Sequence, residues 1–93
     1  MTDDSVYVLG SIEHGWYKIG RSSRVDKRIS EWHTSLPFAT QVFHIERGLT
    51  AAQSRRLEKE LHMRFIHHNI RGEWFHDVDL MELHRFLVRW RTR

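Results

Sequence analysis

The sequence predicts a small α+β domain in which helices flank a three-stranded antiparallel sheet. The 93 residues are enough for one domain, and no proline- or glycine-rich linker divides them. Segments rich in β-branched and aromatic residues alternate with segments whose apolar residues recur every three to four positions. The expected order is strand, strand, helix, strand, helix, short strand, helix. We expect a single domain over residues 1–93, with a core at residues 5–76.

The first two strands are expected at residues 5–9 and 16–20, joined by a turn over residues 10–15. A hairpin that is symmetric about this turn pairs Tyr7 with Lys18. Because side chains alternate between faces, one face is apolar and carries Val6, Val8, Tyr17 and Ile19. The other face carries Tyr7, Leu9, Trp16 and Lys18. A purely structural hairpin does not need a phenol beside an ammonium group.

The segment after the hairpin predicts a helix and then a third strand. Ser23 followed by Asp26 resembles a capping box that opens the helix. An apolar stripe along this helix is formed by Val25, Ile29, Trp32 and Leu36. The opposite side is charged and carries Arg24, Lys27, Arg28 and Glu31. The third strand is expected at residues 40–46, with Phe43 and Ile45 on one face.

A longer helix is expected in the second half of the chain. Thr50 and Gln53 form a capping box at its start, and the helix reaches about His68. Its buried residues recur at a spacing of four, at Leu57, Leu61 and Phe65. Asn69 is suited to end the helix in a left-handed conformation.

The chain then predicts a short extended segment and a last helix. The extended segment covers residues 72–75. The C-terminal helix is expected at residues 77–91, with Asp77 or Asp79 as its N-cap. Its apolar stripe consists of Leu80, Leu83, Leu87 and Trp90.

Composition excludes several classes of protein. The absence of cysteine excludes disulfide scaffolds, cysteine zinc sites and cysteine nucleophiles. No apolar run approaches the ~20 residues of a membrane span, so we expect a cytoplasmic protein with no membrane partner. Fifteen Lys and Arg against 12 Asp and Glu give a net charge of +3 and a pI near 9.8. A pI above about 9 favours a nucleic-acid partner.

Four residues together supply the parts that phosphodiester hydrolysis needs. The reaction needs a group that activates water, cations on the developing phosphate charge and, commonly, a divalent metal on a carboxylate. Two predicted strands and two predicted helices present such groups, at Tyr7, Lys18, Arg28 and Glu58. Taken singly, each is more typical of an ordinary surface side chain.

The order and spacing of four motifs resemble the GIY-YIG nuclease superfamily. The resemblance covers residues 5–76 and is closest to the compact branch of phage and mobile-element proteins that have KIG in place of YIG. The motifs are Val6-Tyr7-Val8, Lys18-Ile19-Gly20-Arg21-Ser22 with Arg28, Leu57-Glu58-Lys59-Glu60-Leu61-His62-x-x-Phe65, and Gly72-Glu73-Trp74-Phe75.

The resemblance implies a role for each matched residue. Tyr7 matches the tyrosine beside the attacking water, and Arg28 matches the arginine that stabilises charge on the scissile phosphate. Glu58 matches the glutamate that holds a single Mg²⁺ or Mn²⁺. The departure lies at Lys18, which stands in place of the second tyrosine. The neighbouring Tyr17 lies on the core face of the hairpin and is interpreted as a core residue.

Two roles stay open for Lys18. As an ammonium it stabilises phosphate charge; as a general base it needs burial and cationic neighbours to lower its pKa from about 10.4. Our hypothesis assigns water activation to Tyr7 and electrostatic help to Lys18.

Other candidates surround these four residues. Flanking phosphates are expected to contact Arg21, Arg24 and Lys27. His33 and His62 are accessory candidates, for which a structural role is favoured, and a zinc site is not expected.

The favoured function is therefore a metal-dependent endonuclease that cuts DNA, with RNA as an open alternative substrate. The alternative class is a nucleic-acid-binding module that keeps the fold with weakened catalysis. Because the sequence contains no separate DNA-recognition module, specificity is expected from substrate shape, a homodimer or a protein partner.

Overall fold

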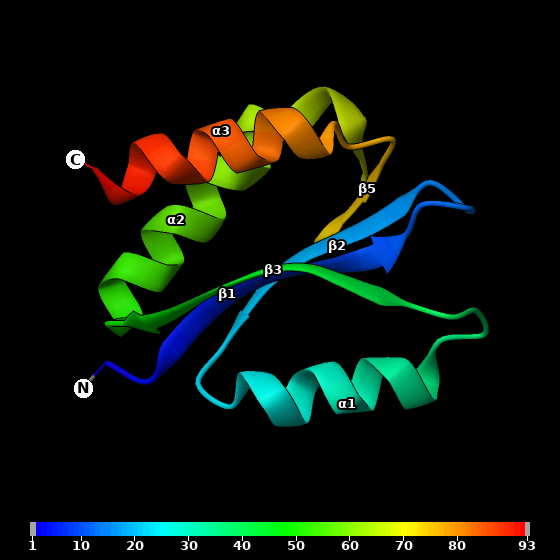
Figure 1. The fold of residues 1–93 in the computed structure, drawn as a ribbon, viewed down its shortest axis with the longest axis horizontal. Coiled ribbons are helices and arrows are strands. Elements are labelled where there is room, and N and C mark those ends of the chain that lie inside the picture. Colours follow the sequence, from blue (N-terminus) through cyan, green and yellow to red (C-terminus); the bar gives the residue numbers. More distant parts are fainter. Residues whose placement is uncertain (1, 93) are drawn as a thin grey trace.

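The computed structural model describes residues 2–92, in which α1 covers one side of a sheet and α2 and α3 cover the other (Figure 1). The predicted α+β class is confirmed. Residues 1 and 93 of the predicted domain lie outside the described residues. The elements are, in chain order, β1 (Asp4–Ser11), β2 (Trp16–Ser22), α1 (Val25–Ser35), β3 (Gln41–Leu49), α2 (Ala51–Arg64), a 3₁₀ helix (Ile66–His68), β4 (Asn69–Arg71), β5 (Trp74–His76) and α3 (Leu80–Arg91).

The antiparallel sheet has five strands rather than three, in the order β3-β1-β2-β5-β4. The additional strands arise because β4 and β5 form a small hairpin, each strand too short for periodicity to reveal. Asn69 does not end a helix in a left-handed conformation; its φ and ψ are −68° and 127°, and it begins β4. Its side-chain amide donates to the carbonyls of Gly72 and Trp74. Accordingly α2 ends earlier than predicted, at Arg64.

The hairpin of β1 and β2 keeps its predicted faces although its register differs. Tyr7 pairs with Gly20 rather than with Lys18. Because side chains alternate with a period of two, this shift by two residues leaves each side chain on its predicted face. The shift arises because β1 extends to Ser11 and the turn is correspondingly shorter. Gly15 closes the turn with a φ of +68°, a value that favours glycine.

An apolar cluster packs against each face of the sheet, as the two predicted faces of the hairpin require. The cluster on the α2 and α3 side includes Val6, Val8, Tyr17, Ile19, Leu57, Leu61, Phe65, Phe75, Leu83 and Leu87. The cluster on the α1 side consists of Tyr7, Leu9, Val25 and Ile29, with Trp32, Leu36 and Ile45 packed against it. Among the described helices, none has both the length and the apolar character that crossing a membrane would require.

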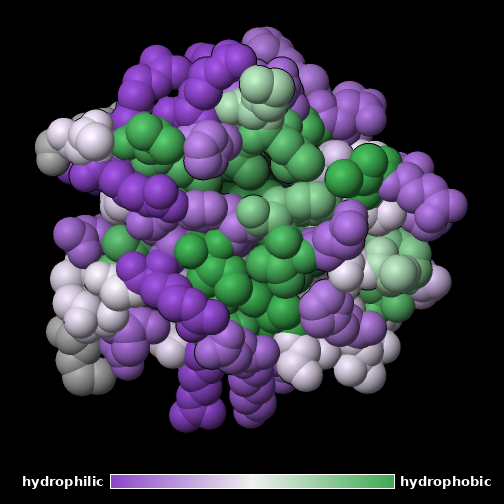
Figure 2. Space-filling model, viewed as in Figure 1, coloured by the Kyte–Doolittle hydropathy of each residue, from purple (hydrophilic) through white to green (hydrophobic). Residues whose placement is uncertain are grey.

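β3 forms one edge of the sheet and contains a bulge. The register against β1 shifts between Val42 and His44, which leaves Phe43 as an extra residue. Phe43 therefore packs with the α2 and α3 cluster, whereas Ile45 packs on the α1 side, and the prediction that they share a face is wrong. Figure 2 shows apolar side chains at the surface in the middle of the face that β3 crosses.

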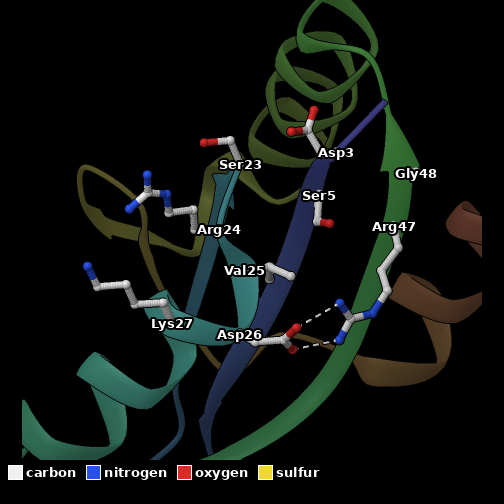
Figure 3. Close-up of a pocket in the computed structure, with 9 residues that line it drawn as sticks. All are labelled: Asp3, Ser5, Ser23, Arg24, Val25, Asp26, Lys27, Arg47 and Gly48. Carbon is white, nitrogen blue, oxygen red and sulfur yellow. Dashed lines mark hydrogen bonds and ion pairs between the residues drawn. The ribbon is translucent and has the colours of Figure 1, made fainter. Parts of the chain in front are cut away.

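The start of α1 differs from its prediction. Its N-cap is Arg24, and no side chain caps the helix, so the capping box of Ser23 and Asp26 is wrong. The Asp26 carboxylate instead accepts two hydrogen bonds from Arg47 of β3, at 2.8 and 3.2 Å (Figure 3). A tertiary ion pair has therefore replaced the local cap.

The other two helix starts use the predicted caps. Thr50 and Gln53 form the predicted capping box of α2. Asp79 caps α3 by accepting from two backbone N–H groups. The predicted start at residue 77 is too early, because Asp77 has a φ of 49° and α3 begins at Leu80.

Candidate active site

Tyr7 reaches the site by lying across Gly20. Tyr7 and Gly20 are direct neighbours in the ladder of β1 and β2. A Cβ atom at Gly20 would lie 2.7 Å from the Tyr7 hydroxyl oxygen and 2.7 Å from Oε1 of Glu73. Such distances are far below van der Waals contact, so only glycine leaves room for both groups. The tyrosine hydroxyl and a carboxylate therefore meet above the backbone of β2.

The edge of β2 is open at this point. β5 pairs with β2 from Trp16 to Lys18, and one more bond joins the Ile19 N–H to the Glu73 carbonyl at 3.0 Å. In the described part of the chain, Gly20 therefore has β1 on one side and no strand on the other. This opening admits side chains from the layers above and below the sheet.

The Tyr7 hydroxyl is buried and oriented by α1. The side chain is 1% exposed, and its oxygen accepts a hydrogen bond from Nε1 of Trp32 at 3.1 Å. Burial raises the pKa of Tyr7 above its ordinary value of 10.0, although the bond from Trp32 opposes this shift. The phenol therefore keeps its proton at neutral pH and acts as a hydrogen-bond donor.

Lys18 lies on the same face in an aromatic and acidic surrounding. Its Nζ is 4.5 Å from the centroid of the Trp32 ring and 5.3 Å from that of Trp74. It also forms an ion pair with Oε2 of Glu73 at 3.6 Å. Burial lowers the pKa of Lys18 below its ordinary value, while the Glu73 carboxylate acts in the opposite direction.

Glu58 and Glu73 form a pair of neighbouring carboxyl groups. Glu58 comes from α2, directly after the buried Leu57, and is half-buried. Burial, the charge of Glu73 and a hydrogen bond to Glu73 together raise the pKa of Glu58 from 4.5 to about 7. The charges of Arg21 and Lys18 oppose the shift. The Glu58 carboxyl therefore keeps its proton to a higher pH than an ordinary glutamate.

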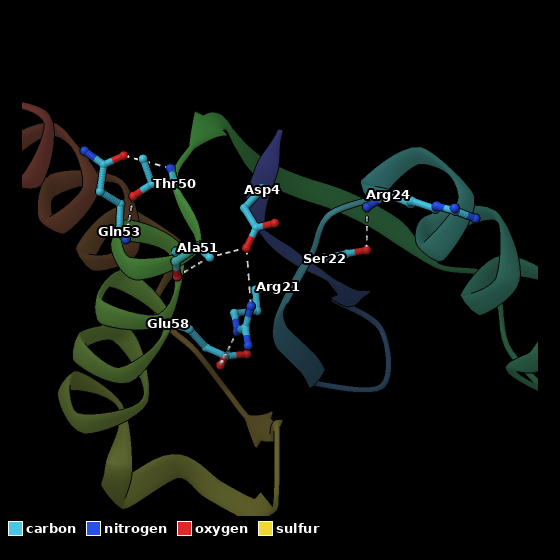
Figure 4. A network of polar contacts seen from close by, with 9 residues as sticks. Asp4, Arg21, Ser22, Arg24, Thr50, Ala51, Gln53 and Glu58 are labelled. Atoms are coloured by element: carbon cyan, nitrogen blue, oxygen red, sulfur yellow. Dashed lines mark hydrogen bonds and ion pairs between the residues drawn. The ribbon is translucent and has the colours of Figure 1, made fainter. Parts of the chain in front are cut away.

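Arg21 joins this pair to a third acidic residue, Asp4 (Figure 4). Its Nη1 donates to Oδ2 of Asp4 at 3.3 Å, and its Nε lies 3.9 Å from Oε1 of Glu58. Ser54 of α2 donates to the same Asp4 oxygen at 2.7 Å. Arg21, predicted as a phosphate contact, thus has two carboxylates as partners and connects β2 with α2.

The other predicted cations are exposed on α1 and at its start. Arg28 is half-exposed, and its Nε lies 3.5 Å from Oε1 of Glu31. Its charge lowers the pKa values of both Tyr7 and Lys18, but by less than burial shifts them. Arg24 and Lys27 line a surface groove together with Arg28. Figure 3 shows Arg24 and Lys27 extending away from the ion pair of Asp26. The three cations thus form a basic rim beside the buried site.

The two accessory histidines differ in position. His62 is held on Ile19 of β2, whose carbonyl oxygen lies 2.9 Å from its Nε2, and its ring packs against Phe75. It therefore connects α2 to the centre of the sheet. His33 is exposed near the end of α1 and hydrogen-bonds to Thr40.

The sequence interpretation missed Glu73 as a site residue. The residue belongs to a motif that the sequence shows, but only the pairing of β5 with β2 brings its carboxylate to Lys18 and Glu58. Within residues 2–92, no group of three or more His, Asp or Glu side chains is arranged to hold a metal ion. Two neighbouring carboxylates, Glu58 and Glu73, are nevertheless the kind of oxygen donors that Mg²⁺ uses when phosphate and water complete its shell.

The fold and the site define a small α+β domain in which a buried tyrosine and a buried lysine lie beside two carboxyl groups and a basic rim. The model of the T5orf172 domain family matches residues 4–91, and the chain belongs to this family. The T5orf172 domain is phage-associated and found in nuclease contexts. No curated protein and no solved structure gives a significant match.

Proposed function

We propose that this domain is a metal-dependent endonuclease of the GIY-YIG type that hydrolyses phosphodiester bonds in DNA. The observation that carries the proposal is the convergence of Tyr7, Lys18, Glu58 and Glu73 around Gly20. These groups come from three elements and the turn between β4 and β5, and burying Tyr7 and Lys18 has a cost that folding alone does not require. The membership of a phage-associated family found in nuclease contexts supports the same function.

In this proposal Glu58 is the main ligand of one Mg²⁺ or Mn²⁺ ion, with Glu73 as a neighbouring oxygen donor. The raised pKa of Glu58 supports this, because a carboxyl pair that repels itself favours a cation between its members. A divalent ion bound there would supply Lewis-acid stabilisation of the phosphate charge. Arg21 holds the Glu58 carboxylate at the opening of β2 and is proposed as a positioning residue.

The remaining residues orient the water and neutralise charge. The Tyr7 oxygen accepts from Trp32, so its own O–H is free to orient the attacking water. The raised pKa of Tyr7 disfavours a phenolate, so the proton of the water passes to another group. Lys18, left open as an alternative, can take it as the neutral amine that burial favours by lowering its pKa. Arg28 faces the developing charge on the phosphate, and Arg24 and Lys27 contact flanking phosphates.

A second function is favoured by one specific observation. Both carboxylates already have a cationic partner, since Lys18 pairs with Glu73 and Arg21 lies beside Glu58. Such internal neutralisation also suits a nucleic-acid-binding module with weakened catalysis. In either case, substrate shape, a homodimer or a protein partner supplies specificity.

The test is cleavage of plasmid DNA, single-stranded DNA and RNA with Mg²⁺, with Mn²⁺ and with EDTA. We expect metal-dependent cutting of DNA that Glu58→Gln abolishes and Arg28→Ala reduces by about 10²-fold or more. Arg56→Ala is the matched control, because this exposed arginine of α2 pairs with Glu60 away from the site. Cutting that persists in EDTA contradicts the metal proposal. Absence of cutting, with DNA binding that weakens steeply between about 50 and 200 mM salt, favours the binding module.

A further inference from the structure

An apolar groove lies beside the candidate active site. Its volume is about 390 Å³, in the size range of small-ligand pockets. It is lined by Trp16 and Trp74, together with Phe38 of the loop after α1. Trp16 is 47% exposed, and Ile70 at the rim is 51% exposed. Large apolar side chains therefore stay open to solvent in a hollow, where burial in a core would favour folding.

The groove is continuous with the site through Trp74. This residue pairs with Lys18 across β2 and β5, and its ring lies 5.3 Å from the Lys18 ammonium. Trp16 lies two residues before Lys18 on the same strand, and therefore on the same face. A chain bound with its phosphate at Lys18 would thus place its next nucleotide over the two tryptophans.

The rings in the groove are arranged to hold a flat ligand. Trp16 meets Phe38 edge to face at 5.6 Å, and His14 stacks on Phe38 at 4.9 Å. These contacts fix the orientation of Trp16 while half of it stays exposed. Arg71 also lines the groove and provides a cation for a phosphate. Aromatic platforms beside cations are a recurring way to bind unpaired bases, because every base has a flat face.

We propose that this groove is a stacking subsite for an unpaired nucleobase next to the scissile phosphate, an inference that rests on the proposed function. The domain then prefers single-stranded or locally unpaired DNA over continuous duplex. A base that remains paired and stacked within a duplex cannot turn its flat face onto the tryptophans of this groove. The preference is independent of base identity, since no side chain of the groove reads base edges.

The test measures binding of a fluorescein-labelled single strand of about 12 thymidines and of a duplex of equal length, in EDTA and about 50 mM salt. We expect the single strand to bind more tightly, and Trp16→Ala to weaken its binding by about 10-fold with little effect on the duplex. Trp16→Phe should restore much of the binding. Met81→Ala, at an exposed position of α3, is the control and should change neither affinity.

The outcomes separate the two proposals. If Trp16→Ala weakens both substrates equally or neither, the stacking subsite is wrong while DNA binding stands. If the wild type binds neither DNA, the proposed function fails together with the subsite. If sedimentation shows a dimer that Trp16→Ala dissociates, the groove is a contact between copies of this chain, and the subsite is again overturned.

Discussion

The two faces of the hairpin formed by β1 and β2 have opposite chemistry although their residues alternate in the same short strands. On the α2 and α3 side, Val8 and Ile19 are buried among apolar neighbours. On the α1 side, Tyr7 and Lys18 are buried just as deeply but carry a hydroxyl and an ammonium group. The first face therefore contributes apolar burial alone. The second face combines apolar burial with polar groups that stability does not explain, which supports the proposal that it is the functional face.

The comparison predicts its largest effect at Ile19. Truncating this fully buried side chain by Ile19→Ala should lower the free energy of unfolding by about 2–5 kcal/mol, because a cavity remains between β2 and α2. Ile12→Ala, in the exposed turn, should change it by less than about 0.5 kcal/mol. Urea denaturation followed by circular dichroism measures both. Equal effects would mean that the α2 and α3 face is not the stabilising one.

The next effect is expected at Gly20, where the two faces meet the open edge. Gly20→Ala should destabilise the fold by about 1–3 kcal/mol, because its Cβ overlaps the Tyr7 hydroxyl and Glu73. It should also displace Tyr7 from Trp32, which a changed tryptophan fluorescence would report. Combined with Tyr7→Ala, it should cost less than the sum of the two single changes, since one of the overlapping groups is then gone. If Gly20→Ala alone is as stable as the wild type, the close approach of Tyr7 and Glu73 to Gly20 is contradicted.

Lys18→Met sharpens the comparison by separating stability from function. Methionine keeps the apolar stem between the two tryptophans and removes a buried charge, so the free energy of unfolding should change by no more than about 1 kcal/mol. DNA cleavage should nevertheless fall by about 10²-fold. Denaturation and cleavage assays on the same preparation measure the two quantities. A strongly destabilised but active variant would place Lys18 among the structural residues.

Much of the fold follows from local sequence patterns. The alternation in residues 5–9 and 16–20 predicts both faces of the hairpin, and the capping box at Thr50 predicts the start of α2. These features could be predicted because neighbouring residues determine them. The bulge at Phe43 could not, because it depends on the pairing of β3 with β1, which are distant in the chain. The hairpin of β4 and β5 could not be recognised in full, because each strand has only three residues, too few for alternation to reveal.

The candidate site likewise has one part that the sequence predicts and one part that it does not. Tyr7 and Lys18 could be placed on one face from alternation alone. The meeting of Glu58 with Glu73 could not, since α2 and β5 are brought together only by the packing of the sheet. The engagement of Arg21 with Asp4 is likewise a tertiary contact, and no local pattern distinguishes Arg21 from the exposed Arg24.

The smallest effect is expected from Glu58→Gln and concerns the dependence of stability on pH. In the folded state the pKa of Glu58 is raised to about 7 from 4.5, so the folded protein binds this proton more tightly than the unfolded chain. Unfolding then releases a proton between those two values, and the stability of the wild type falls as pH rises through this range. Above about pH 7 the wild type has lost all of this contribution to its stability. Glu58→Gln does not titrate and shows no such loss.

Melting temperatures in EDTA at pH 5 and pH 8 test this directly. The difference between Glu58→Gln and the wild type should grow by a few degrees in favour of the variant at pH 8, while all other titrations cancel in the comparison. Mg²⁺ at pH 8 should then stabilise the wild type and leave the variant unchanged, because a cation relieves the repulsion between Glu58 and Glu73. Parallel pH profiles would show that the pKa of Glu58 is not raised in the folded protein. Glu58 and Glu73 would then no longer support the proposed function, and Lys18 alone would have to account for the chemistry of this face.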